Sequence, residues 1–180
     1  MIKNNTQKLV TVAMLLAICI VSQFLKNLSV YITGPIVNTC LIIAAICCGQ
    51  IYALILSTVT PVTAFLITGN PLMSAIPLII PCIMIGNALM ISAVSLVKLK
   101  INSYNKCIVI GGITGSLIKA LFMTLVISYG LIPSMIPEKM MPKIAVFQTT
   151  FSVTQLITAL IGTVYALIIW NALKKVIEKL

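Results

Sequence analysis

CIVIGGITGSLIKALFMTLVISY, residues 107–129, is the stretch that decides the fold: it is apolar and long enough to span a bilayer, yet carries Lys119 at its centre. A charge at the bilayer midplane costs at least ~3 kcal/mol. Gly112, Gly115 and Ser116 lie at helical spacing from this lysine and form a small-residue face that lets other helices approach closely. We therefore expect Lys119 to point into a helix bundle or a cavity rather than toward lipid.

The composition is that of an integral membrane protein. Of the 180 residues, 61% are hydrophobic and 8% are charged, whereas a soluble domain carries about 25% charged residues. The formal net charge of +10 would suggest a nucleic-acid partner in a soluble protein. Here the lysines flank apolar runs, so we assign them to membrane topology and lipid headgroups and expect no nucleic-acid partner. The length fits one membrane domain over residues 1–180.

The charged residues exclude several classes of function. The chain has no histidine, arginine or aspartate, and its acids are Glu138 and Glu178, both in polar connections. A metal cluster, or a catalytic pair or triad built on histidine, cannot form, so we expect neither an enzyme nor a metal or other cofactor. Proton-coupled carriers usually bury an acid, and no apolar run holds one. The cysteines lie in or beside apolar runs, which is typical of packing residues.

The apolar runs predict an all-α fold of six transmembrane helices. These helices cover about residues 9–28, 36–48, 51–67, 74–97, 107–129 and 144–173. We interpret Gly34-Pro35 as a helix breaker at the end of a connection that begins at Lys26. Residues 68–72 form the next clear loop, and the proline-rich residues 130–143 form the longest connection.

Six spans place both termini on one side of the membrane. That side collects most of the lysines, namely Lys3, Lys8, Lys98, Lys100, Lys106, Lys174, Lys175 and Lys179. The other side has Lys26, Lys139 and Lys143. Because positive charge is in excess in cytoplasmic segments, this distribution predicts that both termini are cytoplasmic.

This topology also gives each polar side chain of the spans a depth. Several of them gather between the midplane and the outer surface: Lys119, Asn87, Gln148, Ser152, Gln155 and Asn38. We expect them to line a pocket that opens outward, in which amides and an ammonium orient a polar ligand. The alternative is that they form interhelical hydrogen bonds that hold the bundle together, a role that suits a single amide better than a cation.

Lys119 has no acidic partner in any apolar run. A bound anion, water or the loss of its own proton must take the place of that partner, and a partner protein or a water-filled edge could also receive the ammonium. An anionic or carboxylate-bearing substrate is the interpretation that we favour.

The first predicted helix contains Ala13-Met-Leu-Leu-Ala17, in which two small residues lie one helical turn apart. The following sequence runs from Gly34-Pro35 through Gly49-Gln-Ile-Tyr52 and Thr60-Pro61 to Gly86-Asn87. This pattern resembles the substrate-binding (S) component of an energy-coupling factor (ECF) transporter, and the resemblance covers essentially the whole chain.

The resemblance implies a small protein of the bacterial cell membrane, with six helices and cytoplasmic termini, that captures a vitamin from outside. It also implies that Ala13 and Ala17 dock onto a transmembrane scaffold subunit, which carries two ATPase subunits. Ligand contacts in this family come chiefly from the fourth to sixth helices and the outer loops. ATP hydrolysis in the partner subunits would explain why the chain buries no acid. Members that import cobalt or nickel rely on an N-terminal histidine, which is missing here.

The expected mechanism is capture in the outward-open pocket, closure by loops 26–35 and 68–74, and release inward when the ECF module reorients the protein. One alternative is a self-sufficient secondary transporter or channel, for which an internal repeat or a buried acid would be the sequence signal. Another alternative is a membrane assembly protein that transports nothing, which would need no outward polar pocket.

Overall fold

The computed structural model describes residues 4–24 and 29–177, with side chains as far as Lys174, so Lys3, Lys26, Glu178 and Lys179 lie outside the described residues. The described part of the chain is helical and contains no β-strand. Six helical regions are long and apolar enough to cross a membrane, which confirms the predicted all-α fold. These regions are Asn5–Phe24, Val30–Cys47, Gln50–Thr68, Ile79–Lys100, Tyr104–Met135 and Glu138–Lys174.

The first four spans are single helices, and the last two are composite. The single helices are α1 (Asn5–Phe24), α2 (Val30–Cys47), α3 (Gln50–Thr68) and α5 (Ile79–Lys100), with the short α4 (Pro71–Ala75) before α5. The fifth span comprises α6 (Tyr104–Met123), a π-helical stretch η1 (Thr124–Leu131) and α7 (Ile132–Met135). The sixth comprises a 3₁₀ helix η2 (Glu138–Lys143), α8 (Ile144–Phe151) and α9 (Val153–Ile177).

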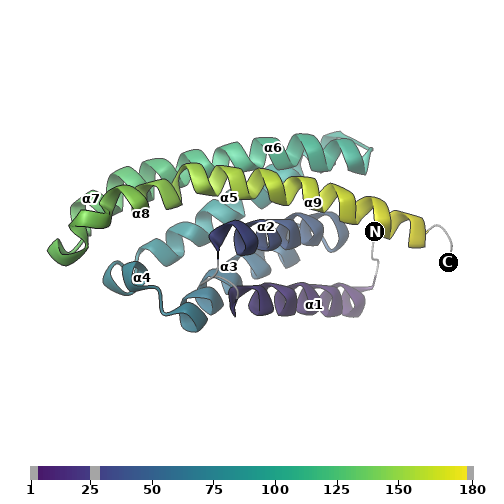
Figure 1. Cartoon of the computed structure of the whole chain (residues 1–180). Coiled ribbons are helices and arrows are strands. Elements are labelled where there is room, and N and C mark those ends of the chain that lie inside the picture. Colours follow the sequence, from purple (N-terminus) through teal and green to yellow (C-terminus); the bar gives the residue numbers. More distant parts are fainter. Residues whose placement is uncertain (1–3, 25–28, 178–180) are drawn as a thin grey trace.

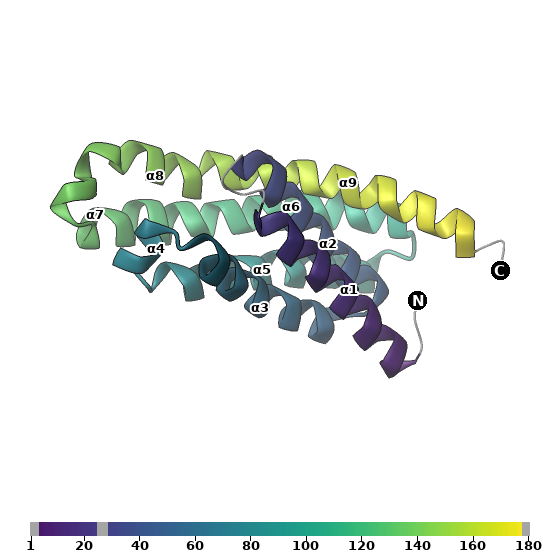
Figure 2. The ribbon, with the colours of Figure 1, turned by 60° about the horizontal axis from the view of Figure 1, so that its bottom comes forward.

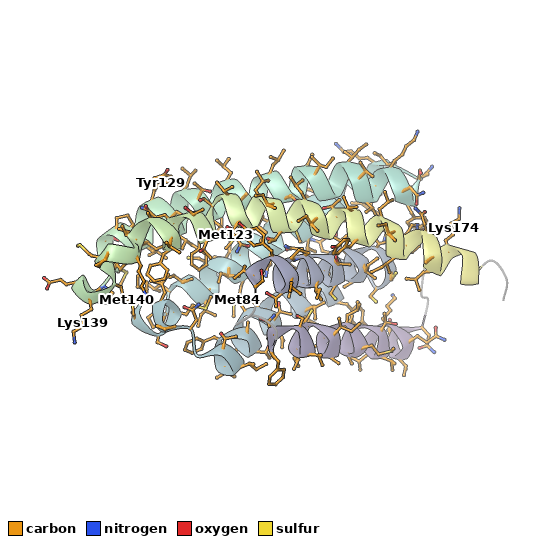
Figure 3. All side chains as sticks on the ribbon, viewed as in Figure 1. Met84, Met123, Tyr129, Lys139, Met140 and Lys174 are labelled. Atoms are coloured by element: carbon orange, nitrogen blue, oxygen red, sulfur yellow. The ribbon has the colours of Figure 1, made fainter. Side chains whose placement is uncertain are left out.

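The spanning helices lie side by side along one long axis (Figures 1 and 2). In both views α1 begins and α9 ends at the same end of the bundle, which we call the terminal end. The short helices α4 and α7 lie at the opposite end, which we call the far end. Lys174 marks the terminal end and Lys139 the far end (Figure 3). The bundle therefore has two chemically distinct ends separated by an apolar middle.

The helix at the centre of the bundle is α2, which packs against α1, α3, α5, α6 and α9. Every residue of α2 from Asn38 to Ile46 is buried. A helix that is apolar on all sides is suited to such an interior position, because no face needs to meet water. The polar Asn38 is thus held inside the bundle by an otherwise apolar helix.

Two glycines let α9 approach α2 closely. A side-chain carbon at Gly34 would lie 2.8 Å from Thr158 Cβ, and one at Gly162 would lie 2.7 Å from Asn38 Cβ, so neither position has room for one. The Thr39 hydroxyl then donates to the Gly162 carbonyl across the interface at 3.0 Å. This contact between α2 and α9 fixes where the Asn38 side chain lies.

The prediction that Gly34-Pro35 breaks the chain is wrong, because both residues lie inside α2, which begins at Val30. Its N-terminus is capped by Ser29, whose hydroxyl accepts from the backbone N–H of Tyr31 at 3.1 Å. Membrane helices tolerate an internal proline where neighbouring helices and side chains satisfy the backbone groups that it frees. A sequence-based breaker rule derived from soluble proteins therefore misplaced this boundary.

The predicted helix over residues 74–97 is divided in the structure into α4 and α5. Asn70 caps α4, since its side-chain oxygen accepts from the backbone N–H of Leu72 at 3.0 Å. Pro77 then disfavours the helical conformation at the preceding Ile76, whose φ of −128° and ψ of 79° end α4. The loop predicted before this helix is correspondingly shorter.

The last two spans also differ from their predicted bounds. Residues 130–143 were expected to be the longest connection, but η1, α7 and η2 make most of this segment helical. The predicted continuous helix over residues 144–173 is interrupted at Ser152 (φ −116°, ψ −94°), which separates α8 from α9. At the other end of the chain, α1 begins at Asn5 rather than at residue 9.

Candidate functional site

A cavity of about 290 Å³ lies at the far end of the bundle. Its lining comes from α1 to α6 and from α8 and α9, so it lies where nearly all the elements converge. This volume is at the small end of the range for small-molecule sites. We call this space the polar cavity because it brings together Asn38, Thr60, Asn87, Lys119 and Gln155, which we call the polar cluster.

Among the described residues, Lys119 is the one charged residue that lines the polar cavity. Its side chain is only 3% exposed, and its ammonium donates a hydrogen bond to Asn38 Oδ1 at 2.7 Å. A hydrogen bond with one ionised partner is about twice as strong as a neutral one, so this bond offsets part of the desolvation of the ammonium. The bond joins α6 to the central helix α2 at the cavity.

No acid within the described residues neutralises this ammonium. Glu138 is the acidic residue of the described chain, and it lies in η2 rather than in the lining of the cavity. Among the described residues, the hydrogen bond to Asn38 is the one contact of Lys119 Nζ with a polar atom. The cavity therefore holds a buried lysine with no acidic partner in the described part of the chain, an arrangement that is rare in membrane spans and typical of functional positions.

The space for the Lys119 side chain is provided by a glycine on α5. A side-chain carbon at Gly86 would lie 3.1 Å from Met123 Cγ and 3.6 Å from Lys119 Cγ. The missing side chain leaves the aliphatic stem of the lysine room between α5 and α6, which pack extensively against each other. The small residues that the sequence placed around Lys119 serve the same purpose, since Gly115 and Ser116 are buried against neighbouring helices.

Two further members of the polar cluster have unsatisfied atoms. Asn87 Oδ1 and Thr60 Oγ1 are buried and make no hydrogen bond. A buried polar atom without a partner costs about 1–3 kcal/mol, so a bound molecule that supplies the missing partner would recover that free energy. Both side chains line the polar cavity.

Four of the residues predicted from the sequence as substrate-binding meet in this cavity. They are Lys119, Asn87, Gln155 and Asn38. Gln155 is half-buried, and its amide nitrogen lies 3.4 Å from the Thr150 carbonyl, a long hydrogen bond that a ligand could replace. These side chains come from four different helices, α2, α5, α6 and α9, which surround the cavity.

The structure does not bring Gln148 and Ser152 to the cavity. The Gln148 amide donates to the Ser128 carbonyl at 3.0 Å, and the Ser128 hydroxyl donates back to the Gln148 carbonyl at 2.9 Å. The Ser152 hydroxyl donates to the same carbonyl at 2.7 Å. These bonds join α8 to η1, and the break at Ser152 ends the helical register that would have aligned both residues with Gln155.

Sequence reasoning missed several residues that line the cavity. Phe147 and Phe151 on α8 face it because the break at Ser152 turns this helix, and an aromatic residue in an apolar span carries no sequence signal of such a role. Thr60 had a weak signal, since it is a polar residue beside Pro61 within an apolar run. Gln23, at the end of α1, is also in the lining.

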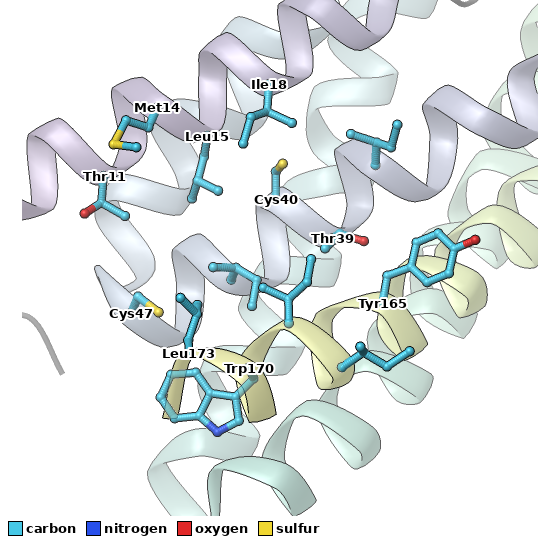
Figure 4. A pocket seen from close by; sticks show the side chains of 14 residues that line it. Thr11, Met14, Leu15, Ile18, Thr39, Cys40, Cys47, Tyr165, Trp170 and Leu173 are labelled. Carbon is cyan, nitrogen blue, oxygen red and sulfur yellow. The ribbon is translucent and has the colours of Figure 1, made fainter. Parts of the chain in front are cut away.

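A larger cavity of about 800 Å³ lies between α1, α2 and α9 (Figure 4). We call it the apolar groove, because its walls are residues such as Leu15, Ile18, Cys40 and Trp170. No charged residue lines it. The hydroxyl of Thr39, one of its few polar groups, is already bonded to backbone carbonyls. The groove therefore has few free polar groups with which to bind a polar ligand selectively.

The docking residues predicted from the sequence, Ala13 and Ala17, are exposed on α1. Large apolar side chains beside them, including Val10, Met14 and Val21, are exposed as well. No other element of the described chain covers this face of α1.

The fold and the cavity together define a multi-pass membrane protein with a buried cation beside a small polar site. The chain matches, over residues 7–177, the family described as "ECF transporter, substrate-specific component", and it belongs to that family. This finding confirms the predicted resemblance, and it identifies a substrate-specific role in transport rather than an enzyme family. A search of curated proteins and a search of solved structures each returned no match.

Proposed function

We propose that this protein captures a small, vitamin-like molecule in the polar cavity and delivers it across the membrane when docked on an ECF module. The observation that carries this proposal is the buried Lys119–Asn38 pair, which has no acidic partner among the described residues and lines a cavity of suitable size. A purely structural hydrogen bond between two helices would not need a cation, whose burial is costly.

The proposed orientation has both termini in the cytoplasm of a bacterium and the polar cavity open to the outside. Its support is the distribution of lysines along the six spans. The helix ends at the terminal end carry the described lysines Lys8, Lys98, Lys100, Lys106 and Lys174, whereas η2, which follows α7 at the far end, carries Lys139 and Lys143. The cavity lies at the far end, which the orientation makes extracellular.

We further propose that Ala13 and Ala17 are the contact with a transmembrane scaffold subunit that carries two ATPases. Two small residues on an uncovered apolar helix face let a second helix approach closely. ATP hydrolysis in the partner would supply the energy, in keeping with the lack of a buried acid among the described residues.

Closure over the ligand was expected from loops 26–35 and 68–74. Residues 26–28 lie outside the described residues, and Val30 to Pro35 are part of α2. In the second segment, Asn70, Leu72 and Met73 line the polar cavity from α4 and its cap. We therefore propose that α4 is the element that covers the ligand.

Uptake by cells tests the proposal. Cells that express this protein are given a panel of radiolabelled water-soluble vitamins, with and without the ECF ATPase subunits. The proposal predicts uptake of one compound that depends on the ATPases. Uptake that persists without the ATPases would instead identify a self-sufficient transporter, and a protein that binds nothing would point to an assembly role.

A double substitution tests the docking surface separately. Replacing Ala13 and Ala17 with tryptophan should abolish uptake while ligand binding by the purified protein stays within about twofold, because the bulky rings prevent close helix contact far from the cavity. The matched control replaces both residues with serine, which keeps the face small and should preserve uptake. Equal loss in both variants would contradict a role for helix approach at this face.

A further inference from the structure

We infer that the ligand of the polar cavity is a compact monocarboxylate that also carries an N–H or O–H donor and an apolar or aromatic body. This inference rests on the proposed function, since it names the chemical class of the molecule that the protein captures. Four features of the cavity support it: the charge of Lys119, the N–H groups of its ammonium that have no acceptor, the unpartnered acceptor atoms and the apolar walls.

The charge of Lys119 favours a ligand that carries one negative charge. Lys119 is the one charged residue among the described residues of the lining, and the acid of the described chain, Glu138, lies outside it. A buried ammonium without a counter-ion favours an anion strongly, because water no longer screens their attraction. A dianion such as a phosphate monoester would leave one negative charge uncompensated, so a carboxylate fits better than a phosphate.

The ammonium also has donors to spare. It has three N–H groups, and the structure pairs one of them, with Asn38 Oδ1 at 2.7 Å. Among the described residues no other polar atom accepts from it. A carboxylate can accept the remaining hydrogen bonds with its two oxygens while the bond to Asn38 keeps the ammonium in place.

The unsatisfied atoms of the polar cluster indicate that the ligand also carries a hydrogen-bond donor. Asn87 Oδ1 is an acceptor without a partner, and Thr60 Oγ1 can accept as well as donate. A ligand with only acceptor groups would satisfy Lys119 and leave Asn87 unpaired. A ligand N–H or O–H supplies the missing donor, so the site selects a molecule with one anionic end and one donor.

Most of the remaining lining is apolar, although Gln23, Thr33, Asn70 and Thr150 also belong to it, and these apolar walls favour an apolar body of the ligand. Phe147 and Phe151 approach from α8, while Leu72, Met73 and Ile83 approach from α4 and α5. Walls of this kind favour a ring or a short aliphatic body over a sugar or a polyanion. The volume of about 290 Å³, at the small end of the range of about 300–1,000 Å³ for small-molecule sites, favours a compact ligand over a large nucleotide-like one.

Two measurements on the purified protein in lipid nanodiscs test the inference. Protein from cells grown in yeast extract is denatured, and the released small molecules are identified by mass spectrometry. Ligand-induced thermal stabilisation is then measured with matched probes: nicotinate against nicotinamide, biotin against biotinamide and pantothenate against pantothenol. Pyridoxal 5′-phosphate represents phosphate monoesters. We expect the recovered ligand to be a monocarboxylate and its neutral counterpart to bind about 100-fold more weakly.

Variants separate recognition from folding. Lys119→Met removes the ammonium and should abolish carboxylate binding. It also leaves Asn38 Oδ1 buried without its partner and should lower the melting temperature, whereas the double variant Asn38→Leu/Lys119→Met removes both partners, should keep most of the stability and should still not bind. Asn38→Asp puts a carboxylate beside the ammonium and should also abolish binding, because the protein then supplies the counter-ion itself. Lys143→Met, at an exposed position of η2, is the matched control and should bind as the wild type does.

The results distinguish a failure of the monocarboxylate assignment from a failure of the proposed capture function. A recovered ligand that is neutral, cationic or a phosphate ester, or that still binds the Lys119→Met variant, would overturn the monocarboxylate assignment and leave the capture function standing. If no small molecule is recovered and no probe stabilises the wild type, the proposed capture function itself is wrong.

Discussion

The two cavities of this bundle share the central helix α2 but differ in almost every other respect. The apolar groove is the larger, at about 800 Å³ against about 290 Å³ for the polar cavity. It offers apolar walls and hydroxyls already bonded to backbone, whereas the polar cavity offers a buried ammonium and two unpartnered polar atoms. We therefore expect unsatisfied chemistry, rather than volume, to decide which of the two spaces takes a polar ligand.

The strongest test of the difference removes the partner of the buried charge. Asn38→Leu leaves the Lys119 ammonium buried without its hydrogen bond, and we expect a loss of about 3 kcal/mol in unfolding free energy. Unfolding by SDS titration in mixed micelles measures this loss. The double variant with Lys119→Met should recover most of the stability, and an equal loss in single and double variants would show that the two side chains are not coupled.

The next test disrupts the close contact between α2 and α9, which separates the two cavities. Gly162→Ala would place a carbon 2.7 Å from Asn38 Cβ, so α9 must move away from α2. We expect a loss of about 2 kcal/mol in stability from this overpacking, together with weaker ligand binding. Gly130→Ala is the control, because its nearest neighbour would be at 3.4 Å and its stability should change little. Equal effects at both glycines would contradict the close approach of α9.

A smaller effect is expected at the terminal end. Lys98 donates to the carbonyls of Ala45 and Ile46, at 3.2 Å and 2.8 Å, and so satisfies the last turn of α2. Lys98→Met should cost about 1 kcal/mol of stability and leave ligand affinity unchanged, since the polar cavity lies at the far end. The exposed Lys100→Met is the matched control. A loss of affinity with Lys98→Met would show that the two ends are linked.

The smallest effect is expected in the apolar groove. Ile168→Ala, which trims a half-exposed side chain of its wall, should change ligand affinity by less than about twofold as measured by calorimetry. A tenfold loss would mean that the groove takes part in ligand binding, and the contrast between the two cavities would fail.

The sequence predicted the six-span all-α architecture because apolar length depends on the bilayer rather than on tertiary detail. It also grouped Lys119, Asn87, Gln155 and Asn38, which the structure brings to one cavity, and their role in substrate binding stays a prediction. It misplaced Gly34-Pro35, which α2 accommodates, and it could not foresee the break at Ser152. That break depends on how α8 packs against η1, which turns Phe147 and Phe151 rather than Gln148 toward the cavity.

The most direct test of the central claim is a structure of the protein with the ligand that it carries from cells. The account predicts that the ligand occupies the polar cavity, with an anionic oxygen within about 3 Å of Lys119 Nζ. A ligand bound in the apolar groove, or one in the polar cavity that leaves Lys119 bonded to Asn38 alone, would contradict it.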